Sequence, residues 1–173
     1  IENWKKQEIL NIAPYYSTLA FGINNNDKIL KDIRVRKALS LAIDRNYIAR
    51  NIGHGKLIAT GGFVPPVVKG LNKSFREESG DYIDINNYAK NIEEAKRLMA
   101  EAGYPNGENF PVLEFYLTFN NDITMFEAIQ NMWKVNLGID IKLIQMEFAP
   151  FINAFRTERN YTMAGASWTG SYN

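Results

Sequence analysis

The stretch over residues 112–146 places the tightest constraint on the fold of this 173-residue chain. Residues 112–119 alternate apolar and polar side chains, which is the period of a half-buried strand. Asp122 then opens a helix with apolar periodicity that ends at Gly138, and residues 139–146 alternate again. Two strands joined by one helix through short loops favour a right-handed parallel β-α-β unit. The sequence therefore predicts an α/β fold.

Two capped helices are predicted upstream, over residues 32–53. Asp32 can accept hydrogen bonds from the first free N–H groups of one helix, and Asp44 offers the same cap to a second helix that Gly53 ends. The apolar face of the first helix consists of Val35, Ala38, Leu39, Ala42 and Ile43. The basic side chains, which we expect mostly in solvent, are Arg34, Arg36 and Lys37.

The rest of the chain alternates short regular segments with one long irregular stretch. Strands are predicted at 9–12 and 16–23, a helix behind a capping box at 91–94, a helix through 151–155 and a last strand at 161–168. Glycine and proline forbid long regular elements between residues 53 and 81. Because compact domains rarely contain such long irregular stretches, we expect a functional or interdomain role for this one.

Composition excludes several classes of protein. A net charge of +1 argues against nucleic-acid binding, because phosphate contacts need concentrated Lys and Arg. No apolar run approaches the roughly 20 residues that span a bilayer. The chain has no Cys, which removes disulfides and thiolate chemistry. It begins at Ile1 without a secretory signal pattern, so we expect any export signal or lipid anchor upstream.

Catalytic or metal-binding groups are hard to assemble from this sequence. His54 is the single histidine and lies in a glycine-flanked loop, where a solvated side chain is the usual outcome. A zinc site would need further His or Cys ligands. Glu93 and Glu94 fit a helix start better than acid–base work, because carboxylates there compensate the helix dipole. We therefore expect no enzyme activity, no cofactor and no metal site.

Aromatic side chains are plentiful, with three Trp, nine Tyr and ten Phe. The strand or helix spacing of Phe115, Phe126 and Trp133 predicts that they pack in the core. Trp168 comes at the end of a strand that enters a Gly-Ser turn, and both a core role and a ligand-binding role fit it. Aromatics beside small or polar residues are typical of ligand sites.

Five segments in order carry a resemblance to a known family. They are FGIN at 21–24, DIRVRKALSLAIDR at 32–45, TGGFVPP at 60–66, AKRLMAEAGYP at 95–105 and MWKVNLGI at 132–139. Together they resemble the peptide-binding branch, family 5, of the bacterial extracellular solute-binding proteins of ABC importers, of the oligopeptide-binding type. The resemblance implies that residues 1–173 are one partial lobe of a two-lobed binding protein. That lobe is expected to close on the ligand and to contain a mixed sheet.

The same resemblance implies partners and a location. The partners are a peptide or peptide-like ligand, the membrane subunits of an ABC permease and the missing lobe of the same protein, with no nucleic acid. The expected location is extracellular or periplasmic, with a membrane anchor upstream of this chain. The residues that the resemblance assigns to ligand binding are Tyr15, Asn120, Phe148, Ser167, Trp168, Thr169 and Ser171. Main-chain hydrogen bonds from the last strand are expected to hold an extended peptide.

Two positions depart from the family pattern. Ser171 stands where the family often has an acidic residue that pairs with the α-ammonium group of the peptide, and Gly165 stands where a basic residue is frequent. Peptide termini are therefore expected to be read elsewhere, or the ligand is not an ordinary peptide. Other relatives take dipeptides, haem, nickel chelates or sugars, so the identity of the ligand stays open.

Two alternatives from other classes remain. The first is a peptide- or pheromone-sensing module that contacts a membrane receptor through residues 53–81 and has no transport role. The second is a peptide hydrolase that depends on His54, which we do not expect.

Overall fold

The computed structural model describes residues 15–170 and divides them between two compact units. The first unit contains residues 15–18, 45–86 and 168–170, and the second contains 19–44 and 87–167. That residues 1–173 form one lobe of a larger protein stays a prediction. The strand predicted at 9–12 lies outside the described residues.

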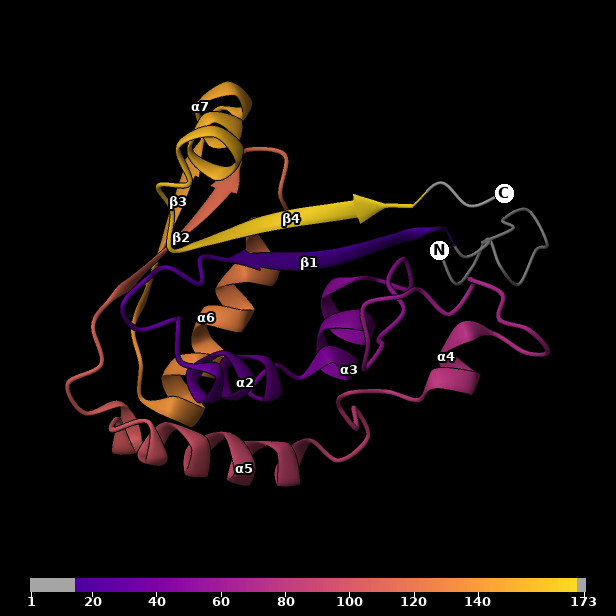
Figure 1. The fold of residues 1–173 in the computed structure, drawn as a ribbon, viewed down its shortest axis with the longest axis horizontal. Helices are drawn as coiled ribbons and strands as arrows, with labels where there is room; N and C mark the ends of the chain where they lie inside the picture. The colour runs from indigo at the N-terminus through magenta and orange to yellow at the C-terminus, as the bar shows by residue number, and fades with distance from the viewer. Residues whose placement is uncertain (1–14, 171–173) are drawn as a thin grey trace. The chain divides into compact units, whose positions relative to one another are not determined.

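One mixed sheet organises the second unit. Its strands are β1 (Ser17–Ile23), β2 (Leu113–Thr118), β3 (Ile141–Met146) and β4 (Met163–Thr169), in the spatial order β1-β4-β2-β3 (Figure 1). β2 pairs in parallel with β3, with Leu113 opposite Ile141, and in parallel with β4, with Phe115 opposite Met163. The predicted α/β class is confirmed.

β1 and β4 run antiparallel, which makes the sheet mixed as expected. The backbone N–H of Asn24 donates to the carbonyl of Thr162 at 3.0 Å, and the N–H of Gly170 donates to the carbonyl of Tyr16 at 2.9 Å. The residue numbers of both pairs add to the same value, so a single register runs along the whole ladder. The chain passes from one unit to the other within each of these two strands.

The predicted parallel β-α-β unit is present. α6 (Ile123–Leu137) joins β2 to β3. Asp122 caps it, because its carboxylate accepts from the N–H of Thr124 at 3.1 Å. Gly138 ends it in the left-handed conformation, with φ of 71°, which a residue without Cβ adopts freely. Local caps and a period-two pattern therefore suffice to define this unit.

Aromatic rings between α6 and the sheet form the core of the second unit. Phe115 of β2 packs edge-on against Phe21 of β1 and Phe126 of α6, with ring centroids 5.0 and 5.2 Å away. It also stacks on Trp133 at 6.1 Å. Phe115, Phe126 and Trp133 are buried, so their predicted core role is confirmed. The indole N–H of Trp133 donates to the carbonyl of Leu39 at 2.8 Å and ties α6 to the preceding helix.

Gly165 of β4 is buried beneath this cluster. A Cβ at this position would lie 2.8 Å from Leu117 and 2.9 Å from Phe126, closer than side chains tolerate. The register places Gly165 opposite Phe21, so the ring of Phe21 can reach Phe115 across the bare strand. The position where the family often has a basic residue therefore faces the core in this chain.

We expect Gly165→Val to lower the free energy of unfolding by about 1–3 kcal/mol, because the added Cβ and its two methyl groups overpack this contact. The midpoint of urea unfolding measures the effect. Ser167→Val, two residues along the same strand and exposed, is the matched control and should change the midpoint little. Equal effects of the two substitutions would contradict the packing described here.

The second unit also contains two antiparallel helices, α2 (Ile33–Leu41) and α5 (Tyr88–Glu101). Asp32 caps α2 as predicted, accepting from the N–H of Arg34 at 2.8 Å. The predicted apolar face of α2 is buried. The arginines do more than face solvent: Arg34 donates to the carbonyl of Glu101 at 2.7 Å, and Arg36 donates to the carbonyl of Leu30 at 2.8 Å. Backbone carbonyls thus accept hydrogen bonds from two of the three basic side chains.

The predicted capping box at 91–94 is wrong. α5 begins at Tyr88 with Asn87 as its cap residue, and the N–H of Asn91 already donates to the carbonyl of Asn87 at 3.1 Å. Asn91 is therefore inside the first turn, where a side-chain cap has no free amide to serve. The remaining elements of this unit are the 3₁₀ helix η2 (Pro105–Gly107), α7 (Phe148–Ile152) and the π-helical η3 (Asn153–Glu158).

The first unit is largely irregular, as predicted for residues 53–81. Its helices are α3 (Arg45–Tyr47), the π-helical η1 (Ile48–Ile52) and α4 (Phe75–Ser79). α3 begins directly after Asp44, and Gly53 ends η1 as expected. α4 was not predicted, because one turn of helix is too short to show a period. Arg76 of α4 is buried and pairs with Asp81, and Gly62 leaves room for its guanidinium group.

Glu78 holds the loop before α4 in place. Its carboxylate accepts from the backbone N–H groups of Leu71, Asn72 and Lys73 at 3.0, 2.6 and 2.9 Å. These bonds lower the pKa of Glu78 because they favour the charged carboxylate. The anion and its three bonds therefore persist at pH 7 and are lost only as the pH falls through the lowered pKa.

Glu78→Gln should speed hydrogen exchange of these three amides about tenfold at pH 7, because a neutral amide oxygen is a weaker acceptor. Mass spectrometry of peptides from residues 70–74 measures the rate. Glu93→Gln on α5 is the control and should leave the rate unchanged. Unaltered protection in Glu78→Gln would show that the carboxylate does not hold the loop.

Candidate functional site

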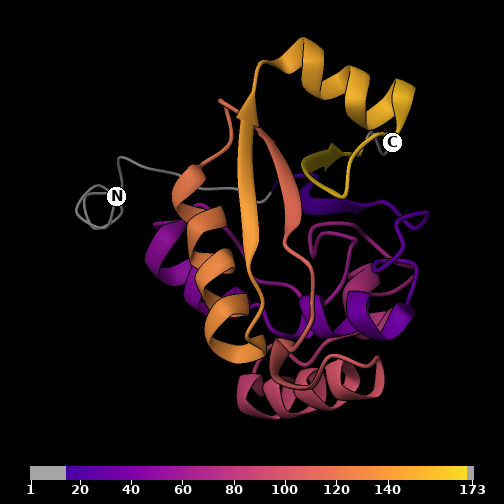
Figure 2. The ribbon, with the colours of Figure 1, turned by 90° about the vertical axis from the view of Figure 1, so that its left-hand side faces the viewer.

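Three parallel strands run toward one edge of the sheet in the second unit, where β2 and β3 end. Thr118 at the end of β2 lies opposite Met146 at the end of β3, and β4 runs parallel to β2 with Ala164 opposite Tyr116. Figure 2 shows β2 and β3 side by side, with α7 following the end of β3. Residues that follow these strands are therefore brought together at the carboxyl edge.

The connections between successive strands change direction at this edge, between β2 and β4. From β2 it passes through α6 to β3 on one side, and from β3 it passes through α7 and η3 to β4 on the other side of β2. α6 packs on the sheet face that carries Phe21, whereas Phe155 of η3 packs against the neighbouring Gly22, which faces the opposite way. In α/β sheets, ligands bind beyond the carboxyl ends of strands at such a switch point.

Three of the residues predicted to bind ligand belong to this edge. Asn120 follows β2 in a turn that Asn121 shapes by accepting from the N–H of Thr118 at 2.7 Å. Phe148 begins α7 just after β3 and is 63% exposed, and Ser167 is exposed on β4. Each of the three predicted residues is on or just after a different strand, so the sheet topology gathers residues that are far apart in the sequence.

β4 continues past this edge, and no residue in the described range 15–170 pairs with its β2-facing side beyond the end of β2. β2 ends at Thr118, which the register aligns with Ala166, so β2 cannot pair with β4 further on. On its other side, β4 stays paired with β1 as far as Gly170. Residues 163–165 are buried and residues 167–169 are exposed. An extended chain can therefore pair with β4 over its exposed end.

The other predicted residues belong to the first unit. Trp168 is 62% exposed and Tyr15 is 69% exposed, which excludes the core role that the sequence left open for Trp168. Thr169 donates its hydroxyl to that of Ser17 at 3.3 Å across the β1–β4 ladder. Ser171 lies outside the described residues.

Phe63 is an exposed aromatic that sequence reasoning did not assign to ligand binding. Phe63 is 53% exposed, and its carbonyl accepts from the hydroxyl of Thr18 at 2.7 Å. The sequence signal that could have pointed to Phe63 was its place in the segment at 60–66. The glycines and prolines of that segment leave no helix or strand periodicity to interpret.

His54 is exposed in its loop. Within residues 15–170 no group of three or more His, Cys, Asp or Glu side chains is arranged to hold a metal ion. None of the helices in that range is both long and apolar enough to cross a membrane.

All residues of the chain, 1–173, match the family of bacterial extracellular solute-binding proteins, family 5, in its middle region. The chain belongs to this family. The periplasmic oligopeptide-binding protein OppA of Escherichia coli is 31% identical over 171 residues, which cover 97% of this chain and 30% of that protein. The chain thus spans less than a third of the length of this curated relative.

Solved structures show the same fold. A periplasmic oligopeptide-binding protein from Borrelia burgdorferi is 34% identical with a TM-score of 0.75, over 90% of this chain and 29% of that one. OppA of Haemophilus influenzae, in complex with the peptide RPPGFSPFR, is 26% identical with a TM-score of 0.77, over 99% of this chain and 33% of that one. The expected family and the periplasmic-binding-protein fold are confirmed.

Proposed function

We propose that the protein carrying this chain is the non-catalytic substrate-binding component of an ABC transporter that captures oligopeptides outside the membrane. The observation that carries the proposal is the open side of β4 at the carboxyl edge, in a chain that belongs to the family 5 solute-binding proteins. Relatives that cover nearly all of this chain are named oligopeptide-binding proteins, and one of them holds a peptide. Membrane subunits of a permease are the proposed recipient of the ligand.

The peptide is proposed to bind as an added strand along β4. The backbone of residues 167–169 would supply hydrogen bonds that do not depend on the peptide's side chains, which permits many sequences. Trp168 and Tyr15 would contact the peptide with their exposed rings. Asn120, Phe148, Ser167, Thr169 and Ser171 are the further proposed contacts.

The chemistry of these groups supports binding and not catalysis. The proposed contacts are aromatic rings, hydroxyls, one amide and backbone groups, and none of them is a carboxylate, an imidazole or an amine. The proposal therefore includes no bond-breaking step. Because the named relatives from Escherichia coli and Borrelia burgdorferi are periplasmic, we propose a location outside the cytoplasmic membrane, with anchoring through a segment upstream of this chain.

Trp168→Ala in the full-length protein should weaken peptide binding about tenfold or more, because exposed aromatic anchors carry a large share of interface energy. Calorimetry with a mixture of random oligopeptides, and then with the best binder isolated from it, measures the change. Tyr82→Ala is the matched control, since Tyr82 is exposed in the same unit but lies off the two strands.

The control should retain the wild-type dissociation constant. Failure of every peptide in the mixture to bind the wild-type protein would contradict the proposed function. Equal affinity of wild type and Trp168→Ala would show that Trp168 does not contribute to peptide binding.

A further inference from the structure

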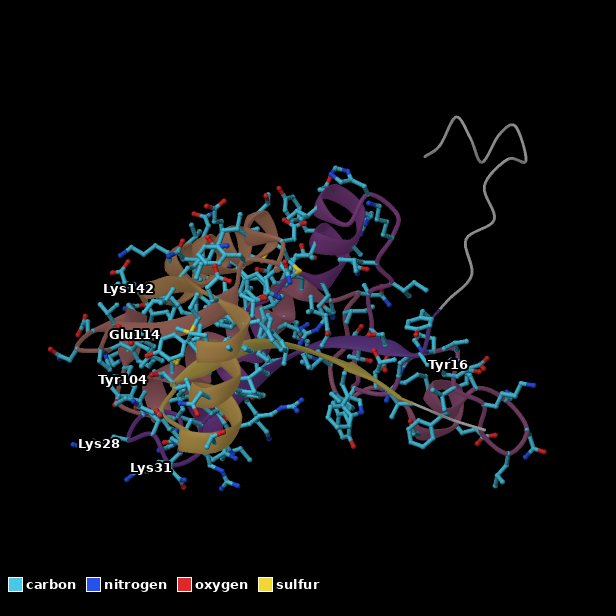
Figure 3. All side chains as sticks on the ribbon, turned by 90° about the horizontal axis from the view of Figure 1, so that it is seen from above. Tyr16, Lys28, Lys31, Tyr104, Glu114 and Lys142 are labelled. Atoms are coloured by element: carbon cyan, nitrogen blue, oxygen red, sulfur yellow. The ribbon has the colours of Figure 1, made fainter. Side chains whose placement is uncertain are left out.

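The turn between α5 and β2 contains the single Asn-Gly step of the chain, Asn106–Gly107. Asn106 is exposed, and both residues are in the left-handed region, with φ of 52° and 79°. The backbone N–H of Gly107 donates to the carbonyl of Tyr104 at 3.1 Å, and Figure 3 labels Tyr104. The turn therefore holds in place the backbone nitrogen that follows an exposed side-chain amide.

The backbone of this turn packs directly against the end of α6. A Cβ at Gly107 would lie 2.5 Å from the carbonyl oxygen of Gly138, and a Cβ at Gly138 would lie still closer to the carbonyl oxygen of Asn106. Both distances are shorter than side chains tolerate. The two backbones are therefore in contact with no side chain between them, and this contact restricts the movement of Asn106 and Gly107.

An exposed Asn that precedes Gly can lose its side-chain amide without an enzyme, because a Gly has no Cβ to hinder attack by its nitrogen. The nitrogen of Gly107 attacks Cγ of Asn106, the Cγ–Nδ2 bond breaks, and Nδ2 leaves as ammonia with the proton of the attacking nitrogen. Water then opens the resulting succinimide ring at one of its two carbonyl groups. Opening at Cγ gives aspartate, whereas opening at the main-chain carbonyl gives isoaspartate, whose main chain runs through Cβ and Cγ.

The native turn opposes this reaction. Ring closure brings the nitrogen of Gly107 onto Cγ of Asn106, which requires rotation of ψ of Asn106 away from its native 23°. That rotation breaks the hydrogen bond to Tyr104 and shifts the carbonyl group that contacts Gly138. The reaction can therefore proceed only while the turn is locally open.

We propose that Asn106 is a site of spontaneous deamidation whose rate is set by the opening of this turn, and that the contact with Gly138 keeps the turn closed. Isoaspartate adds one carbon atom to the main chain. Two backbones that are already in contact leave no room for that atom, so the modified turn cannot close again. The inference does not depend on peptide binding.

The test follows loss of the Asn106 amide in the full-length protein at mildly alkaline pH, by mass spectrometry of proteolytic peptides. A synthetic peptide of residues 102–110 gives the rate without the fold. We expect the folded protein to react about tenfold or more slowly than this peptide, because local opening costs free energy. The slowing should equal the protection of the Gly107 amide against hydrogen exchange within about threefold, since one opening frees the same N–H for both reactions. The isoaspartate form, separated by chromatography, should lose that protection.

Gly138→Ala tests the contact itself. Its Cβ would press on the carbonyl group of Asn106, so the turn should open more often and Asn106 should react at least about threefold faster. Gly80→Ala is the matched control, because Gly80 has nearly the same φ, 72° against 71°, but nothing within 4 Å of an added Cβ. It should leave the rate unchanged. The thermal midpoint shows whether each variant folds, and if Gly138→Ala does not, the exchange comparison in the wild type decides.

Three results would overturn the inference. An unreactive Asn106 in the synthetic peptide would remove the modification site. Equal rates in the peptide and in the folded protein, or a slowing unrelated to exchange of the Gly107 amide, would show that the turn does not control the reaction. Equal acceleration by Gly138→Ala and Gly80→Ala would assign the effect to backbone strain in general. Acceleration by Gly138→Ala alone, with matching exchange in the wild type, would establish the site and its control by the turn.

Discussion

The contact between the bare backbone of Gly165 and the ring of Phe126 determines where the last strand lies. α6 can press its aromatic side chains onto the sheet because β4 carries no side chain at that point, and Phe21 then meets Phe115 across the strand. This packing inserts β4 between β1 and β2. Well-packed interiors tolerate few changes of volume, so the contact sets both the position and the register of β4.

The free end of β4 follows from that position. β2 is only six residues long and stops where β4 is still half-way along its course, so among the described residues the exposed half of β4 pairs on one side only, with β1. An unpaired strand side is a hazard for most proteins, because it invites pairing with other chains. Under the proposed function, the same property would serve to bind an extended peptide. The buried Gly165 thus determines where the exposed end of β4 lies, several residues further along the strand.

Local signals predicted the parts of the fold that depend on neighbours in sequence. The unit from β2 to β3 was predicted because strand alternation, the Asp122 cap and the Gly138 stop are all readable within 35 residues. The start of α5 was misplaced by one turn, because Asn91 resembles a cap residue and the weaker signal at Asn87 was overlooked. α4 escaped prediction because it is a single turn held by Arg76 and Asp81, a pairing without periodicity.

The candidate site was only partly accessible from sequence, for a different reason. The resemblance supplied Asn120, Phe148 and Ser167, but their common position at the carboxyl edge requires the order of the strands. Gly165 was read as the loss of a basic residue, although its role is to let a ring approach. Register between β1 and β4 is a long-range property, and no local pattern reports it.

The decisive measurement is the affinity of the full-length protein for one bound peptide and for derivatives with a single N-methyl group at each successive backbone amide. Methylation removes one donor without changing the side chains. Pairing along β4 predicts that binding falls about tenfold or more at alternate amides and little at those between, because successive N–H groups of a strand point to opposite sides. Affinities that do not depend on the position of the methyl group, or that equal the affinity of the unmethylated peptide at every position, would contradict pairing along β4.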